Sequence, residues 1–400
     1  MASGSFLRVS SAVWTLAGYN SQRIAIPGVL CMAVLLACGS ASAVSANSPD
    51  TRIPLFANGT YGYACYRIPA IVRTPDGTLL AFAEARKNNC DDFGNVRLVL
   101  RRSHNGGTSW SALQVVAENG ALQADNATPV VDTMDPNYPH GRVFLLYSTG
   151  DMPSDKVLAG KGTRRGWVRA SVDDGATWSK PVEITASVKL PSRREFATGP
   201  GHALQLAIGP HAGRILIPAY HSAGPPQPMS RQYEANTFFS DDHGLTWHLG
   251  ATVAWPGTNE STAAQTAEGT VVLNSRDESG SHTRILSVSK DGGQHWESTF
   301  AAHDLPDPVC QGSMLRYQPS GKKSVLLFSN PGNPSARRDL TISVSRDGGR
   351  TWPKRTILYP GPAAYSDIVV MPKGRLGILW EEGGGNKGIT FSVTPIQPLL

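Results

Sequence analysis

The stretch SHNGGTSW at 103–110 recurs in related form four more times, as SVDDGATW at 171–178, SDDHGLTW at 240–247, SKDGGQHW at 289–296 and SRDGGRTW at 345–352. The consensus of these boxes is S-x-D-x-G-x-T-W, and five of the nine tryptophans occupy its last position. Self-similarity of this kind is the signature of a repeat architecture, in which each repeat is one small supersecondary unit. The boxes therefore predict a fold built from similar units.

The residue types of each box suit a tight turn between two strands. The glycine can adopt a positive φ without steric cost, and the Asp side chain can accept hydrogen bonds from N–H groups of its own turn. Asn105 replaces Asp in the first box and can make the same bond, whereas His295 replaces Thr in the fourth, where the hydroxyl contact is not assured. We interpret the boxes as structural turns, because one or two carboxylates per turn are too few for a calcium loop.

A strand-like run precedes each box, and the box starts are 68, 69, 49 and 56 residues apart. Dividing residues 50–400 by six leaves roughly 58 residues per unit, which suits a four-stranded propeller blade. We therefore predict an all-β protein, a six-bladed β-propeller of four-stranded antiparallel blades. The sixth blade lacks a box. We expect it to combine the C-terminal runs RLGILWEE and GITFSVTPI with an N-terminal strand, which closes the ring and removes exposed sheet edges.

Composition excludes some function classes. The 400 residues include 37 Lys and Arg against 31 Asp and Glu, a formal net charge of +6. The sequence holds no basic run and no nucleic-acid motif, so we expect no nucleic-acid partner. A few arginines concentrated in one cleft would instead suit an anionic substrate.

An apolar stretch at 24–43 follows Arg23 and ends in Ala-Ser-Ala. This pattern predicts a signal peptide or export leader over 1–43, with the folded domain at 50–400. The run Leu35-Leu36-Ala37-Cys38 also resembles a lipoprotein box, in which Cys38 is lipidated. An apolar leader that merely contains a cysteine fits equally well, so a lipid anchor stays open. In either case we expect an exported monomer, located outside the cell, in the periplasm or at the cell surface.

The exported part keeps three cysteines, Cys65, Cys90 and Cys310. A Cys65–Cys90 disulfide can form, but three cysteines do not make a disulfide framework. No C-x-x-C or H-E-x-x-H spacing indicates a metal. We therefore expect neither a metal nor another cofactor.

The segment Cys65-Tyr66-Arg67-Ile68-Pro69 lies upstream of the first box. Tyr-Arg-Ile-Pro resembles the (F/Y)RIP motif of sialidases, and TLLAFAEAR at 78–86 and LVLRRS at 98–103 are similar to the same family. The resemblance covers about residues 52–396. It implies a six-bladed propeller with exo-α-sialidase activity, which cleaves terminal α-linked sialic acid from glycoproteins, glycolipids or oligosaccharides without a metal.

The resemblance also identifies candidate substrate-binding residues. Arg67 in YRIP, Arg276 in VVLNSR and Arg337 in RRDLT match the three arginines that bind the substrate carboxylate, with Arg338 as a rival to Arg337. Arg86 at the end of AFAEAR matches an arginine that lines the pocket near the 4-position of the sugar.

The same comparison identifies candidate catalytic residues. Tyr365 in GPAAYSD matches the nucleophile and Glu260 in TNEST its general base. Asp92 in CDDFG matches the acid/base, with Asp91 as a rival. Glu381 in ILWEE matches the carboxylate that steadies the first arginine, and here the rival is Glu382.

The chemistry of sialic acid explains these residue types. The sugar carries a carboxylate on its anomeric carbon, and guanidinium groups bind carboxylates bidentately while staying charged. A carboxylate nucleophile would be repelled by that group, whereas a neutral phenol avoids the repulsion. A phenol with a pKa near 10 needs a base at neutral pH, the role expected of Glu260. We therefore predict a retaining mechanism.

Each candidate residue alone is typical of a solvated, packed or turn side chain, and only their common order and spacing favours a site. Two other functions share these features. A trans-sialidase would use the same residues and add an acceptor site, which a product analysis with lactose would reveal. A non-catalytic propeller that binds sialic acid would keep the boxes but lose Tyr, Glu or Asp from the site. In every case the partners are sialylated glycans.

Overall fold

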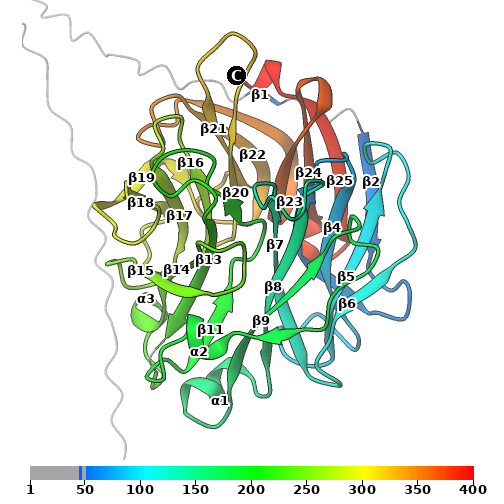
Figure 1. Ribbon diagram of the computed structural model, residues 1–400, viewed down its shortest axis with the longest axis vertical. Coiled ribbons are helices and arrows are strands. Elements are labelled where there is room, and N and C mark those ends of the chain that lie inside the picture. The colour runs from blue at the N-terminus through cyan, green and yellow to red at the C-terminus, as the bar shows by residue number, and fades with distance from the viewer. Residues whose placement is uncertain (1–44, 47–50, 223) are drawn as a thin grey trace, which may run out of the picture. The chain divides into compact units, whose positions relative to one another are not determined.

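The computed structural model describes residues 45–46, 51–222 and 224–400, so the expected leader at 1–43, with Cys38, lies outside the described residues. The described part is a β structure (Figure 1). Its few helical segments are short and lie in connections: α1 (Ser154–Leu158), α2 (Thr185–Val188), α3 (Met229–Gln232), and the 3-10 turns Pro372–Gly374, Gly383–Gly385 and Gln397–Leu399. None of the described helices is long and apolar enough to cross a membrane.

Strand pairing gives four sheets, within which the described strands fall into six consecutive antiparallel sets. The first two sets are joined by a parallel pairing of Val96 with Gln123, and the last two share one long strand. The first set contains β3 (Cys65–Arg73), β4 (Leu79–Arg86), β5 (Val96–Ser103) and β6 (Gln114–Ala117). The second set contains β7 (Gln123–Asp132), β8 (Arg142–Gly150), β9 (Arg164–Ser171) and β10 (Val182–Glu183). The third set contains β11 (Glu195–Thr198), β12 (Leu204–Gln205), β13 (Ile215–Ser222), β14 (Glu234–Ser240) and β15 (His248–Thr252).

The remaining sets follow the same order. The fourth set contains β16 (Thr258–Gln265), β17 (Val271–Asp277), β18 (Thr283–Ser289) and β19 (Ser298–Pro306). The fifth set contains β20 (Ser313–Tyr317), β21 (Val325–Pro331), β22 (Arg338–Ser345) and the first half of β23 (Lys354–Met371). The sixth set contains the second half of β23, β24 (Arg375–Glu382), β25 (Gly388–Pro395) and β2 (Thr51–Ala57). The two-residue strand β1 (Ser45–Ala46) pairs in parallel with β23.

The two ends of the described chain meet in the sixth set. In Figure 1 the N-terminal strand β2, in blue, lies beside the red C-terminal strand β25. The two strands pair antiparallel, with Thr51 opposite Val393 and Ala57 opposite Gly388. The expected union of an N-terminal strand with the C-terminal runs is therefore confirmed.

In each of the first five sets the box forms the turn before the last strand, and the sixth set has no box. In each box the serine hydroxyl accepts from the glycine N–H, as between Gly175 and Ser171 at 2.8 Å. Asn105 makes the bond expected of Asp, since it accepts from Ser109 N–H at 2.9 Å. In the fourth box, Nδ1 of His295 lies 2.6 Å from Asp291 and replaces the hydroxyl contact.

A glycine is required in the first box by close packing as well as by its backbone angle. Gly107 has φ +86°, and a Cβ atom there would lie 2.1 Å from the ring of Phe391. The box residue Trp110 packs edge-on against the same ring at 5.1 Å between centroids. The turn at the end of the first set is therefore fixed against β25 of the sixth set.

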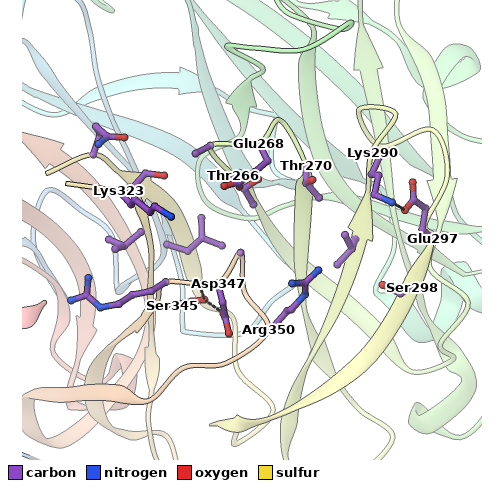
Figure 2. Close-up of a pocket in the computed structure, with 18 of the residues that line it drawn as sticks. Thr266, Glu268, Thr270, Lys290, Glu297, Ser298, Lys323, Ser345, Asp347 and Arg350 are labelled. Atoms are coloured by element: carbon purple, nitrogen blue, oxygen red, sulfur yellow. Dashed lines mark hydrogen bonds and ion pairs between the residues drawn. The ribbon is translucent and has the colours of Figure 1, made fainter. Parts of the chain in front are cut away.

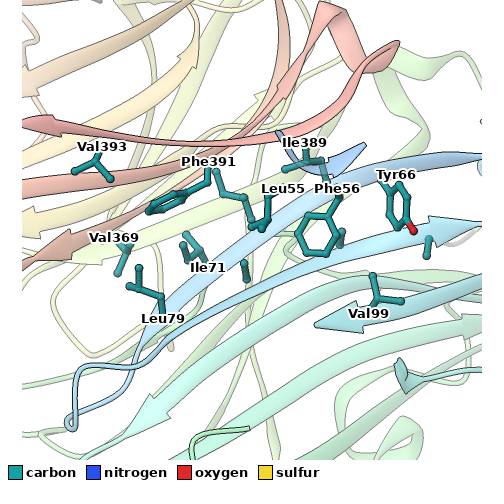
Figure 3. Packing of buried hydrophobic residues seen from close by; sticks show 14 of the residues in the cluster. Leu55, Phe56, Tyr66, Ile71, Leu79, Val99, Val369, Ile389, Phe391 and Val393 are labelled. Carbon is teal, nitrogen blue, oxygen red and sulfur yellow. The ribbon is translucent and has the colours of Figure 1, made fainter. Parts of the chain in front are cut away.

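The hydrophobic core is divided into clusters that lie between consecutive sets. Figure 3 shows the cluster between the sixth and first sets, where Phe391 and Val393 of β25 face Ile71 and Leu79. Further clusters join the first set to the second, the second to the third, and so on to the sixth. Each set thus buries its apolar faces against its neighbours, including the sixth against the first.

We predict that Asp242→Ala lowers the free energy of unfolding by about 1 kcal/mol, because the turn of the third box loses the bonds from Thr246 and Ser240. Burial opposes the charge of Asp242, but these hydrogen bonds lower the pKa of its carboxyl. The stabilisation is therefore present above the unfolded-state pKa and is lost as pH falls through the lowered folded-state value. Urea unfolding at pH 7 and at acidic pH measures both effects.

Asp155→Ala is the matched control, because that exposed carboxylate pairs with its neighbour Lys156 at 3.1 Å and belongs to no box. Equal losses of stability in the two variants would contradict a structural role for the box carboxylate.

Candidate active site

The candidate residues lie at the strand ends opposite the boxes. Arg67 is on β3, Glu260 on β16 and Tyr365 on β23. In each of these strands the pairing shifts by one residue at the candidate side chain, between 67 and 70, between 258 and 261, and between 363 and 366. Such bulges re-aim side chains and are common next to active sites.

The candidate residues that lie close together are called the arginine cluster: Arg67, Glu260, Arg276, Arg337, Tyr365 and Glu381. Its centre is formed by Tyr365, Glu260 and Arg276. The Tyr365 hydroxyl donates to Glu260, with its oxygen 2.6 Å and 2.7 Å from the two carboxylate oxygens. Nη1 of Arg276, on β17, lies 2.6 Å from Glu260 and 2.9 Å from the same hydroxyl. The phenol and the carboxylate are both buried. A phenol in direct contact with a carboxylate can pass its proton to that group.

The environment keeps the phenol protonated at rest. Burial and the charge of Glu260 raise the pKa of Tyr365 well above 10, although Arg276 and Arg337 oppose the rise. The neutral phenol is therefore the resting form at neutral pH, and Glu260 is the acceptor that faces its proton.

The other two candidate arginines lie over the ring of Tyr365. The guanidinium carbons of Arg67 and Arg337 are 5.3 Å and 5.5 Å from the ring centroid. Because Arg276 contacts the hydroxyl of the same residue, the three arginines converge on one tyrosine. Arg337 donates to the carbonyl of Val309 at 2.8 Å, and no carboxylate among the described residues pairs with it.

Glu381 holds the first arginine and the tyrosine together. Its Oε1 accepts from Nε of Arg67 at 2.6 Å and from the N–H of Ile68 at 2.8 Å. Its Oε2 accepts from the N–H of Tyr365 at 3.3 Å. Ile68 has φ +58°, an uncommon conformation for a β-branched residue, in the bulge of β3. The fully buried carboxylate thus fixes both bulges.

Asp92 lies at the edge of the cluster and does not contact Tyr365 or Glu260. It belongs to the loop between β4 and β5, where its Oδ1 is 2.8 Å from Nη1 of Arg86 and its side chain is 88% exposed. Burial disfavours the charge of Arg67, but Glu381, Tyr365 and Asp92 raise the pKa of Arg67. The carboxylate of Asp92 therefore stabilises the positive charge of Arg67, although the two side chains form no ion pair. The same loop is tied to β3 by a Cys65–Cys90 disulfide, while Cys310 is a buried free thiol.

Each candidate and its rival differ in the contacts that they make. Asp91 bonds to Asn89 within the loop, whereas Asp92 reaches Arg86. The rival Arg338 is exposed and pairs with the adjacent Asp339 at 3.2 Å. The rival Glu382 pairs with Arg52 and Lys387, away from the cluster.

Two carboxylates of the site were not identified from the sequence. Glu278 contacts Nη2 of Arg276, and Glu84 lies 2.7 Å from Nη2 of Arg86. Burial, opposed by Arg86, raises the pKa of Glu84 to about 7. Glu84 lies two residues before Arg86 on β4, and Glu278 lies two residues after Arg276, just past the end of β17. Alternate residues of an extended segment share one face. That spacing is the signal that could have found them.

Two other features outside the cluster contain charged residues. Asp132, Asp135 and His243 could together ligate a cation, but Nη2 of Arg142 already lies 2.9 Å from Asp135 and offsets one of the two carboxylate charges. A hollow of about 880 Å³ lies between the fourth and fifth sets, at the box end (Figure 2). There Lys290 pairs with Glu297 at 2.8 Å, and no residue of the cluster lines the hollow.

Comparison with known proteins supplies independent evidence. Residues 77–378 match the BNR repeat-like domain family. The chain is 35% identical over 362 residues to a sialidase of Micromonospora viridifaciens, a match that covers 86% of this chain and 54% of that protein. It is 31% identical to an exo-alpha-sialidase of Aspergillus fumigatus, over 72% of this chain and 69% of the relative. The chain thus spans about half the length of the bacterial relative.

A solved structure also matches. The chain superimposes on the Hadza microbial sialidase Hz136 with a TM-score of 0.73 and 27% identity. The superposition covers 85% of this chain and 67% of that chain. The likeness therefore extends over most of this chain.

We predict that Glu381→Gln lowers the free energy of unfolding by roughly 3 kcal/mol, because it leaves the buried Arg67 charge without its carboxylate. Urea unfolding of the purified variant measures the loss. Glu382→Gln is the matched control and should cost less than about 1 kcal/mol, since its partners Arg52 and Lys387 are largely exposed. A larger loss in Glu382→Gln than in Glu381→Gln would refute this account of the cluster.

Proposed function

Because this chain belongs to the exo-α-sialidase family, we propose that it hydrolyses terminal α-linked sialic acid from glycoproteins, glycolipids or oligosaccharides. The observation that carries the proposal is the convergence of three guanidinium groups on Tyr365, whose hydroxyl contacts Glu260. A carboxylate-bearing sugar is the substrate that such a cluster suits, because guanidinium groups recognise carboxylates bidentately.

In this proposal Arg67, Arg276 and Arg337 bind the carboxylate of the sugar. Arg67 and Arg276 are held by carboxylates of the protein, which orients them before substrate arrives. Arg337 has a charge that no described carboxylate neutralises, so the substrate carboxylate supplies its partner. Orientation by three fixed groups places the anomeric carbon close to the phenol and reduces the entropy lost on reaction.

In the first step the Tyr365 oxygen attacks the anomeric carbon as its proton moves to Glu260, and the bond to the leaving oxygen breaks. Asp92 gives its proton to that oxygen. The short contact between the phenol and Glu260 supports this role, because a phenol with a raised pKa needs a base at the moment of attack.

In the second step a water molecule gives a proton to Asp92 and attacks the anomeric carbon. The bond to Tyr365 breaks, and the phenol oxygen recovers its proton from Glu260. Two displacements on one carbon retain the anomeric configuration. The exposure of Asp92 at the edge of the cluster supports its role, because the leaving group and the water must both reach it. Arg86 orients Asp92 and lines the pocket near the 4-position of the sugar.

We also propose that the six sets close into a six-bladed propeller. The pairing of β2 with β25 and the cluster shared by the sixth and first sets support closure. We further propose that residues 1–43 direct export of the 50–400 domain as a monomer, with Cys38 as a candidate lipid anchor. The Cys65–Cys90 disulfide supports an oxidising compartment.

We predict that the protein hydrolyses a fluorogenic α-sialoside and that Tyr365→Phe lowers kcat roughly 10³-fold or more, because the variant lacks the attacking oxygen. The release of the fluorophore measures the rate. Tyr61→Phe removes an exposed hydroxyl and is the control, with an expected rate equal to that of the wild type. A folded wild-type protein without turnover would reject the hydrolase in favour of a non-catalytic sialic-acid-binding propeller.

We predict that the first product is the α-anomer of free sialic acid, because two displacements restore the original configuration. Proton NMR spectra recorded during the reaction separate the α-anomer from the β-anomer that forms later by mutarotation. A β-anomer as the first product would instead indicate a single displacement by water.

A further inference from the structure

Asp367 is a buried carboxylate that the proposed reaction does not use. It lies on β23 two residues after Tyr365, and its side chain is fully buried. Five donors surround its two oxygens. They are Ile71 N–H (2.7 Å), His202 N–H (3.0 Å), His202 Nδ1 (2.6 Å), Ser313 Oγ (2.6 Å) and Ile368 N–H (3.0 Å).

These donors come from several sets of strands. Ile71 is on β3 just after the bulge that contains Arg67, and Ser313 begins β20 of the fifth set. His202 lies between β11 and β12 of the third set. With Asp367 itself in the sixth set, one carboxylate joins four of the six sets directly below Tyr365. A shift of Asp367 would therefore move Tyr365 relative to Arg67.

His202 supplies the charge that balances this carboxylate. Its Nδ1 lies 2.6 Å from Oδ1 of Asp367, and its backbone N–H donates to Oδ2 of the same carboxylate at 3.0 Å. A carboxylate at this distance favours the cationic form of the ring, in which both nitrogens carry a proton.

Few other charges act on the ring. The ring of His202 pairs with Asp367 of β23, and its side chain is 13% exposed. A hollow of about 130 Å³ beside the ring is lined by Arg316 of β20 and by uncharged residues of β12 and β16. Burial opposes the proton on His202, but the charge of Asp367 and its hydrogen bond outweigh burial and raise the pKa of His202 above its usual value.

We propose that His202, as an imidazolium paired with Asp367, is a positioning residue that holds Tyr365 against Glu260 and Arg67. The inference rests on the proposed function, because it assigns the pair a role in the attack by Tyr365. Neither residue touches the phenol or the proposed substrate position. The pair acts by keeping a buried carboxylate compensated, since an unpaired buried charge is costly and the segment that bears it would rearrange.

The pH dependence follows from the sign of the pKa shift. A histidine with a raised folded-state pKa contributes its stabilisation fully below the unfolded-state value. The contribution is lost as pH rises through the folded-state value. We therefore expect kcat to fall on the alkaline side as His202 loses its proton, with little change in KM, because the arginines that bind the carboxylate keep their charge.

The first measurement is a nitrogen-15 NMR titration of the full chain. We expect His202 to titrate above the usual histidine pKa of about 6.5, with both ring nitrogens protonated at pH 7. The missing signal in His202→Gln assigns the resonance. A neutral His202 at pH 7 would overturn the inference.

The second measurement is the pH profile of kcat and KM for a fluorogenic α-sialoside. We expect His202→Gln to lower kcat roughly 10-fold to 100-fold, to change KM less than about twofold, and to lose the alkaline limb that tracks the NMR titration. His243→Gln is the matched control, because that residue forms a similar pair with Asp132 (3.0 Å) at the box end. It should leave kcat and its pH profile unchanged.

The outcomes separate the two proposals. An inactive folded wild-type protein overturns the proposed function, whereas an active wild type with an unchanged His202→Gln profile overturns the positioning role. If His202→Gln does not fold, the wild-type profile decides. An alkaline limb that coincides with the His202 titration supports the inference, and a limb that does not coincide overturns it.

Discussion

The cluster depends on a break of strand pairing at the same level in several strands. A regular strand sends successive side chains to opposite faces, so every second residue would face away from the cluster. The one-residue shifts in β3, β16 and β23 interrupt this alternation at Arg67, Glu260 and Tyr365. β7 has the same shift, between Asp125 and Thr128. Each bulge interrupts the hydrogen bonds between paired strands. Glu381 compensates in two of the bulges by accepting hydrogen bonds from the N–H groups of Ile68 and Tyr365.

Charge balance is the second constraint on this arrangement. Burying an arginine is tolerated only when a carboxylate or another acceptor faces it. Arg67 faces Glu381, and Arg276 faces both Glu260 and Glu278. Arg337 faces a backbone carbonyl and the ring of Tyr365, and no carboxylate among the described residues pairs with it. The three arginines therefore differ in function within the proposed complex. Two are held rigid by the protein, and the third has the larger unused capacity to bind an anion.

The sequence predicts the turns better than the site. A box encodes its turn within eight residues, so local chemistry locates it, and the one set without a box is also the one built from both ends of the chain. The rival positions of Asp92, Arg337 and Glu381 differ by one residue and are distinguished only by the paired strands and loops. The two-residue spacing between Arg276 and Glu278 could have identified Glu278 from the sequence. The contact of His202 with Asp367 spans 165 residues and four sets, and no local pattern encodes it.

Hydrogen bonding differs between the two ends of the strands, and this difference explains why the site lies at one end. At the box end, the serine, carboxylate and glycine of each turn satisfy one another, so their polar groups are already used. At the opposite end, polar groups from different sets satisfy one another, as His202 and Ser313 do with Asp367. Glu381 and Asp367 do this from neighbouring strands, each by accepting N–H groups at a bulge or beside one. The groups that complete the fold at this end are therefore the groups that orient the arginines and the tyrosine, so that stability and the geometry of the site cannot be varied independently.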